Sequence, residues 1–188
     1  MARPKSDDRR NAITEAAIGV ISKEGLAATT AAIAKEASIS NGSLFTYFET
    51  KADLLNHVYV ELKSEMASGA LDGLSVDASN REQLHHMWIG WMRWATASPQ
   101  KRRALAHLQV SDEVTAESHR LAGQKMAGVA ALLERSRANG PMGGAPLAFV
   151  VALMNAVADA TIGHMLSDPI NAETHSRDGF EAMWRIIA

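Results

Sequence analysis

Apolar residues recur every three or four positions along most of the chain, which is the spacing of one face of an α-helix. The first such stripe runs through residues 7–23 and contains Ile13, Ala16, Ala17, Val20 and Ile21. Gly25 follows it, in the position where a helix commonly ends. We find no convincing alternation with a period of two, so no strand is expected. The pattern therefore predicts an all-α fold.

Between residues 33 and 48 the helical pattern is divided into two short pieces. The run Ser38-Ile39-Ser40 separates them, and Ser40 is a good N-cap for the second piece because its hydroxyl can accept from the backbone N–H of residue 42 or 43. Leu44 and Phe48 lie four residues apart and are expected to face inward. Two short helices joined by a tight turn are the outline of a helix-turn-helix, whose second helix enters the major groove of DNA.

The outward side of the second short helix is polar but uncharged, and it carries Asn41, Ser43, Thr46 and Tyr47. A face that meets only solvent would normally carry Lys or Glu, whereas residues 38–48 contain no charge. Asn, Ser and Thr suit base edges and phosphates. Gly42 weakens a helix, but it lets the backbone come close to a phosphate. We interpret this face as a DNA-contacting surface; the alternative is an ordinary solvated face.

The same segment resembles the TetR-type family of bacterial transcriptional regulators. The positions that match the family pattern are Ile33-Ala34, Ala37-Ser38-Ile39-Ser40, Gly42-Ser43-Leu44-Phe45, Tyr47-Phe48, Lys51 and Leu54. Ser38 replaces the family's turn glycine, Ser43 a threonine and Phe45 a tyrosine. We expect Ser38 to hold a backbone conformation that glycine would adopt more easily. Phe45 lacks the hydroxyl with which a tyrosine could contact a phosphate.

The resemblance implies which residues contact DNA. Tyr47 and Lys51 would grip the phosphates, and Thr29 or Thr30 would form a second grip at the start of the preceding helix. Which of the two threonines faces the DNA is left open. The full predicted set is Thr29, Thr30, Ser40, Asn41, Gly42, Ser43, Phe45, Thr46, Tyr47 and Lys51.

The rest of the chain is predicted to form a second helical region. Thr50-Lys51-Ala52-Asp53 resembles a capping box that opens a long helix. Later helices are expected over residues 81–97, 112–138, 146–166 and up to 187, with a basic turn at Lys101-Arg102-Arg103. We predict a three-helix DNA-binding head over residues 1–48 and a ligand-binding and dimerisation domain over residues 49–188.

The most apolar stretch, residues 147–166, is long enough to span a membrane. Asn155, Asp159 and His164 argue against this, since an Asp at mid-bilayer alone costs about 2.5–3.5 kcal/mol. Small side chains at three- and four-residue spacing would let another helix approach closely. The family's dimer interface falls here; a central helix in a monomer core is the alternative. The predicted interface residues are Ala148, Ala152, Ala156, Ala160, Gly163 and Trp184.

A stripe of large apolar side chains on residues 81–97 fits either an ordinary core or the lining of a cavity. In the resembled family the C-terminal helices enclose an inducer cavity, so the resemblance implies a small-molecule effector that is largely apolar. The predicted lining consists of Trp88, Trp91, Met92, His107, Met126, Met154, Asn155 and Asp159.

Composition and charge limit these interpretations. With 47% hydrophobic and 21% charged residues the chain is ordinary globular protein. The net charge of −2 does not favour a nucleic-acid-binding protein, because binding to phosphates relies on Lys and Arg. The positions of the basic side chains nevertheless favour DNA binding, because they cluster near the N-terminus, at Arg3, Lys5, Arg9 and Arg10. The sequence contains no cysteine and its N-terminus has no apolar signal-peptide core, so a cytoplasmic protein is expected.

Nothing in the sequence favours an enzyme or a cofactor. We find no nucleophile elbow, phosphate-binding loop or dinucleotide fingerprint. A metal site is not expected either, since the adjacent His85 and His86 point about 100° apart on a helix. The favoured function is a repressor that binds a palindromic DNA operator as a homodimer and is released by its effector. A ligand-blind or protein-partnered DNA-binding protein of the same fold and an effector-activated regulator remain open.

Overall fold

The computed structural model describes residues 5–188, which are largely helical and contain no strand. The chain forms two compact units. The first comprises the residues up to Ser64 together with Ser98–Lys125, and the second comprises Glu65–Ala97 together with Met126–Ala188. These units group the residues that pack together, whereas the boundary predicted between residues 48 and 49 separates a DNA-binding head from a ligand-binding and dimerisation domain. That functional boundary therefore stays a prediction.

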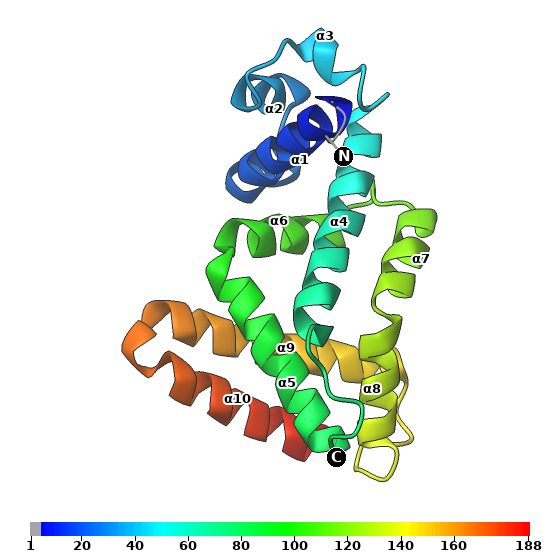
Figure 1. Ribbon diagram of the computed structural model, residues 1–188, viewed down its shortest axis with the longest axis vertical. Helices are drawn as coiled ribbons and strands as arrows, with labels where there is room; N and C mark the ends of the chain where they lie inside the picture. The colour runs from blue at the N-terminus through cyan, green and yellow to red at the C-terminus, as the bar shows by residue number, and fades with distance from the viewer. Residues whose placement is uncertain (1–4) are drawn as a thin grey trace. The chain divides into compact units, whose positions relative to one another are not determined.

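The first unit contains the predicted helix-turn-helix. Its elements are α1 (Lys5–Glu24), the 3₁₀ turn η1 (Gly25–Ala27), α2 (Thr30–Glu36), α3 (Asn41–Leu44), most of α4 (Lys51–Leu71), α6 (Pro99–Gln109) and α7 (Ala116–Lys125). Helix α1 packs against α2 and α6, and α2 packs against α3 (Figure 1). The apolar stripe predicted for α1 is buried, with Ile13 and Ile21 fully enclosed. Gly25 ends this helix in the left-handed region, at a φ of 63°, as its position predicts.

Side-chain caps fix where the longer helices begin. The backbone N–H of Thr50 donates to the Asp53 carboxylate at 3.0 Å, and the N–H of Asp53 donates to the Thr50 hydroxyl at 3.0 Å. The capping box predicted for α4 is therefore confirmed. The same reciprocal arrangement joins Ser79 and Glu82 at the start of α5 (Asn80–Ala97). Both boxes satisfy backbone donors that a helix leaves free in its first turn.

The second unit is built around a single apolar cluster. Its elements are the end of α4, α5, α8 (Ala127–Arg137), α9 (Leu147–Ser167), the 3₁₀ turn η2 (Pro169–Asn171) and α10 (Ala172–Ile187). Helices α9 and α10 form an antiparallel pair that packs against α5, and α5 also packs against α8 (Figure 1). Trp88 is fully buried at the centre of this cluster, where its indole Nε1–H donates to the Ser176 carbonyl at 2.9 Å.

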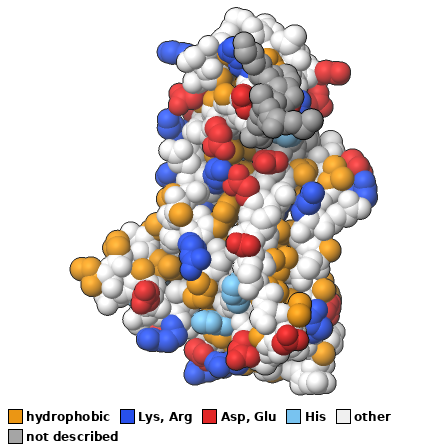
Figure 2. Space-filling model, viewed as in Figure 1, with side chains coloured by type: hydrophobic (Ala, Val, Ile, Leu, Met, Phe, Trp, Pro, Cys, Tyr) orange, Lys and Arg blue, Asp and Glu red, His pale blue; other side chains and the backbone are white. Residues whose placement is uncertain are grey.

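Helix α9 is the one helix in residues 5–188 that is long and apolar enough to cross a membrane by length and composition alone. Its mean hydropathy is 1.5, yet only 28% of the apolar window is buried within the chain. Hydrophobic side chains also gather on the surface where α9 ends and α10 begins (Figure 2). There Leu166 is 42% exposed and Ile170 is 95% exposed. Apolar side chains of α9 and of the turn to α10 therefore remain exposed on the surface of the second unit.

Two sequence predictions for the middle of the chain are wrong. The single helix expected over residues 112–138 is broken at Met126, so that α7 and α8 are separate, and residues 110–115 are not helical. Asn56 of α4 holds this non-helical segment, because its side chain donates to the Glu113 carbonyl and accepts from the Thr115 N–H, both at 2.8 Å. The expected basic turn lies inside α6, since Pro99 occupies the first position of that helix and starts it early.

Candidate nucleic-acid interface

Two side-chain caps shape the helix-turn-helix in the first unit. The Thr29 hydroxyl accepts from the Ala32 N–H at 3.1 Å and so caps α2. The Ser40 hydroxyl accepts from the Ser43 N–H at 3.1 Å and so caps α3, which confirms the capping role predicted for Ser40. The Ser40 and Ser43 hydroxyls also lie 2.8 Å apart. These contacts define the start of both short helices.

Ser38 sits in the turn with a φ of 54°, in the left-handed region. It is the only residue other than glycine with a positive φ in the part of the chain that the structure describes. The strained conformation expected at this position is therefore confirmed. An L-residue pays about 1–2 kcal/mol for this conformation, which a glycine would adopt without that cost.

The α3 segment depends on its neighbours because four helical residues cannot hold themselves together in water. Leu44 and Phe48 anchor it from below, and both are buried as predicted. Arg10 of α1 secures its far end. The Arg10 Nη1–H donates to the Tyr47 carbonyl at 2.9 Å, and the guanidinium lies 4.3 Å from the centre of the Phe48 ring. The first helix thus fixes the orientation of the outward face.

The outward face combines most of the residues predicted to contact DNA. Asn41, Gly42, Ser43, Phe45 and Thr46 are exposed there together with Ser40, and Tyr47 is half-buried. The Thr46 hydroxyl donates to the Ser43 carbonyl at 2.5 Å, which holds its side chain against the segment. Apart from Phe45, these groups offer hydroxyl, amide and backbone donors and acceptors, the types that contact phosphates and base edges.

A polar hollow of about 290 Å³ opens on this face, lined by Arg9, Ser38, Ile39, Ser43, Thr46 and Tyr47. Arg9 was not in the predicted contact set, although its place in the N-terminal basic cluster was a visible signal. It adds an exposed positive charge beside the uncharged α3 face. Of that cluster, Arg3 lies outside the described residues. Arg10 serves the packing of α3, as described above.

The remaining predicted DNA contacts flank this face. Thr29 is exposed, and Thr30 is half-buried at the first position of α2. Lys51 is also half-buried. Its ammonium donates to the Leu26 carbonyl at 2.9 Å and lies 3.9 Å from the Glu113 carboxylate. The structure thus gives Lys51 a bridging role inside the unit, and two further ammonium donors are left for a phosphate.

The predicted ligand-lining residues do not form one group. Trp88, Met92 and Met154 belong to the buried cluster of the second unit, and Trp91 and Met126 pack against it. Asn155 is half-buried and Asp159 is exposed on α9. His107 belongs to the first unit, where it is exposed and packs beside Gly25. Their role in binding a ligand stays a prediction.

The predicted interface stripe is brought together on one side of α9. Its members Ala148, Ala152, Ala156, Ala160 and Gly163 are all exposed. Trp184 is placed elsewhere: it is half-buried, with its ring 6.2 Å from that of Phe180 and 5.8 Å from the Arg81 guanidinium. The stripe is therefore a continuous surface of small side chains that does not include the tryptophan.

Three ionisable side chains of α4 have shifted pKa values. Burial, and then the nearby Arg10 charge, lower the pKa of His57, with Glu61 acting in the opposite direction. Burial lowers the pKa of Lys63 and raises that of Tyr59, whose hydroxyl lies 3.1 Å from Nδ1 of His119. Among the residues described, no group of three His, Asp or Glu side chains could hold a metal ion.

Comparison with known proteins matches residues 13–58 to the family model described as bacterial regulatory proteins, tetR family. The whole chain also resembles solved structures. A TetR family transcription regulator from Marinobacter aquaeolei VT8 is 22% identical, with a TM-score of 0.86 over 100% of this chain and 99% of that one. A protein from Shewanella sp. PV-4, described as a tetR family transcription regulator, is 23% identical, with a TM-score of 0.85 over 96% and 98%. The transcriptional regulator FadR from Bacillus subtilis, solved in complex with stearoyl-CoA, is 16% identical, with a TM-score of 0.70 over 95% and 99%.

Proposed function

We propose that this protein is a homodimeric, ligand-responsive transcriptional repressor, because residues 13–58 match the tetR family model and the whole chain resembles the fold of solved TetR-family regulators. It binds a palindromic DNA operator in the cytoplasm and is released by a small, largely apolar effector. The observation that carries the proposal is the helix-turn-helix. Its outward face is uncharged, hydrogen-bonding and exposed, and α1 holds it rigidly through Arg10.

We propose that α3 enters the major groove with Asn41 and Thr46 toward base edges. Asn can bond bidentately to adenine, and the short hydroxyl side chains can contact bases or phosphates. Arg9, Tyr47 and Thr29 then contact the backbone on either side, and Gly42 lets the α3 backbone approach it closely. Such a surface makes few charged phosphate contacts, so pairing two copies on one operator supplies the affinity that a single head lacks.

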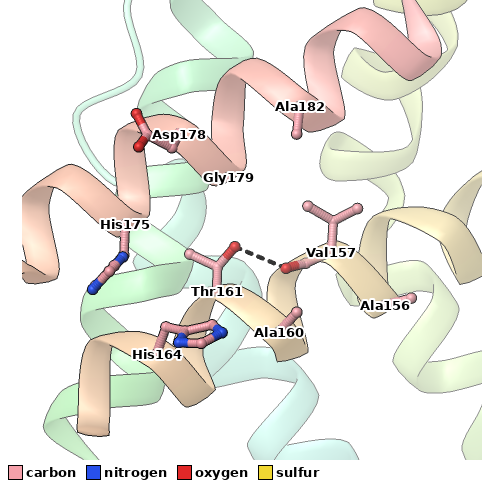
Figure 3. Close-up of a pocket in the computed structure, with 9 residues that line it drawn as sticks. All are labelled: Ala156, Val157, Ala160, Thr161, His164, His175, Asp178, Gly179 and Ala182. Carbon is pink, nitrogen blue, oxygen red and sulfur yellow. Dashed lines mark hydrogen bonds between the residues drawn. The ribbon is translucent and has the colours of Figure 1, made fainter. Parts of the chain in front are cut away.

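The proposed dimer contact is the exposed face of α9 and α10. Ala156, Val157 and Ala160 of α9 lie opposite Gly179 and Ala182 of α10, across a groove of about 470 Å³ (Figure 3). A Cβ added at residue 179 would lie 2.2 Å from the Thr161 hydroxyl, so only glycine at this position lets α9 and α10 lie this close together. A second copy packed by two-fold symmetry would cover this small-residue surface. It would also explain why so apolar a helix is only 28% buried within one chain.

The proposed ligand response acts as a two-state equilibrium. The dimer without effector holds its heads at the operator spacing, and the effector binds better to another state, so it shifts the population by its difference in affinity. Helix α4 connects DNA binding with effector binding, since it begins beside the helix-turn-helix in the first unit and ends in the second. The stearoyl-CoA complex of the structurally similar FadR supports a small-molecule effector with a long apolar part.

The test is fluorescence anisotropy with a labelled DNA fragment from immediately upstream of the protein's own gene, in a salt series with competitor DNA. We expect saturable binding that weakens with salt and falls about a hundredfold in Asn41→Ala, because each of the two heads loses one bidentate base contact worth about tenfold. Gln109→Ala, on the exposed end of α6, is the matched control and should bind like the wild type. Binding that competitor DNA removes uniformly, or that Asn41→Ala leaves unchanged, would contradict the proposed reading of DNA by α3.

A further inference from the structure

Ser176 of α10 has a buried hydroxyl without a hydrogen-bond partner. The residue is only 4% exposed, and its Oγ is unsatisfied. Buried hydroxyls in other helices of the chain donate to the carbonyl four residues earlier: Thr14 at 3.1 Å, Ser136 at 2.9 Å and Thr161 at 2.8 Å. Ser176 makes no such bond. A buried polar group left unpaired costs about 1–3 kcal/mol, so this hydroxyl calls for a partner from outside the protein.

The Ser176 residue lines a groove of about 450 Å³ between α5 and α10. Ile89 and Met92 of α5 form one apolar wall, and Met165 from the end of α9 and Ala172 of α10 complete it. This volume lies within the range of about 300–1,000 Å³ that is typical of small-molecule sites, and methionines adapt their shape to a ligand. The groove lies beside the core and shares Met92 with the ligand-lining set predicted from the sequence, whereas none of the other predicted lining residues lines it.

The polar residues at this groove are mainly basic. Arg93 of α5 and Arg177 of α10 both line it with exposed side chains. The opposing charge in the lining is Glu173, and the Arg177 guanidinium also lies 3.5 Å from the exposed Asp178 carboxylate. His85 lies at the same groove, with its ring packed edge-on against Phe180 at 4.6 Å. Two guanidinium groups against one lining carboxylate favour an anionic ligand, for which arginine is the preferred partner.

We propose that the α5–α10 groove binds small carboxylates with an apolar tail, the tail lying on Ile89, Met92 and Met165 and the carboxylate accepting from Ser176 and the arginines. This inference rests on the proposed function, because it names the chemical class and the site of the effector. The Ser176 hydroxyl donates to a carboxylate oxygen and so gains the partner that the helix does not supply. Glu173 sets a limit on affinity, since its negative charge opposes that of the ligand.

The test is a titration of the full-length protein with octanoate, octanol and octylamine, followed by tryptophan fluorescence. Trp88 is a built-in reporter because its indole donates to the Ser176 carbonyl. We expect octanoate to bind saturably and at least tenfold more tightly than the other two. Ser176→Ala should weaken octanoate binding about tenfold, as expected for loss of a hydrogen bond to a charged group. Arg93→Gln should weaken it severalfold, and Glu173→Gln should tighten it.

Arg185→Gln, an exposed charge change on α10 away from the groove, is the control and should bind octanoate like the wild type. Equal binding by Ser176→Ala, or a preference for octanol or octylamine, would overturn the proposal. The exposed Glu173→Gln variant keeps the test decisive if Ser176→Ala misfolds, since unchanged octanoate binding in that variant also counts against it. DNA binding is measured separately. If the protein binds its operator but shows no Ser176-dependent response to octanoate, the proposal for the groove is wrong and the proposed function stands. If octanoate binds in a Ser176-dependent way but the protein binds no operator, the proposed function is wrong and the ligand site stands.

Discussion

Replacing Ser38 by glycine should stabilise the helix-turn-helix, because Ser38 is held at a φ of 54°. A non-glycine residue pays about 1–2 kcal/mol in this region. Glycine loses more conformational entropy on folding, which offsets about 0.5–1 kcal/mol of that gain. The net expectation for Ser38→Gly is about 0.5–1 kcal/mol of added stability. For a chain of this size it corresponds to a rise of about 1–4 °C in the melting temperature of the unit that contains the turn.

The assay is thermal unfolding followed by circular dichroism, together with urea unfolding at 25 °C. Ser40→Gly is the matched control, because it makes the same chemical change two residues away, at an ordinary φ of −73°. Loss of the Ser40 cap to glycine should cost a few tenths of a kcal/mol. The two substitutions should therefore shift the unfolding midpoint in opposite directions. A Ser38→Gly protein no more stable than the wild type would refute the claim that this turn carries backbone strain.

Three further predictions concern the arginine clamp, a histidine and the proposed dimer. Arg10→Met should destabilise the first unit by about 1–2 kcal/mol in urea unfolding, since it loses the bond to the Tyr47 carbonyl and the contact with the Phe48 ring. The exposed Arg9→Met variant should keep the stability of the wild type and bind DNA more weakly. Equal losses of stability in the two variants would contradict these separate roles. The pKa of His57 is lowered by burial and by Arg10, so below its ordinary value of 6.5 the unfolded chain binds more protons and stability should fall as the pH drops from 7 to 5. His57→Gln should flatten that pH dependence of urea unfolding, and an unchanged slope would show that other groups cause it. Ala160→Arg should convert the dimer to a monomer in light scattering, because a charged side chain is placed in the α9–α10 contact, while Ala106→Arg on the exposed side of α6 should remain dimeric.

The sequence predicted the helix-turn-helix well because its determinants are local. Ser40 as a cap, Ser38 as the strained turn residue, and Leu44 and Phe48 as inward anchors all follow from residues within a few positions of one another. The capping box at Thr50 and Asp53 was visible for the same reason. Local hydrogen bonds of this kind depend little on the rest of the fold.

One error, and the features that the sequence did not predict, involve contacts between residues distant in the sequence. The non-helical segment before α7 involves Asn56, which lies more than fifty residues away and bonds to that segment. The phosphate contact that the family resemblance implies for Lys51 stays a prediction, and the bond of Lys51 to the Leu26 carbonyl depends on how α4 meets the turn after α1. Arg9 and Arg10 are adjacent basic residues whose different roles follow only from their directions on α1. The α5–α10 groove around Ser176 likewise needed the packing of three helices to be seen.

We propose that two copies of this protein read one palindrome through α3. The most direct test is a selection of bound fragments from the protein's own genome, comparing the wild type with Asn41→Ala and Gln109→Ala. We expect the wild type and Gln109→Ala to enrich a common palindrome with half-sites about one helical turn apart, and Asn41→Ala to lose this enrichment. Enrichment of unrelated fragments, or the same palindrome with all three proteins, would contradict it.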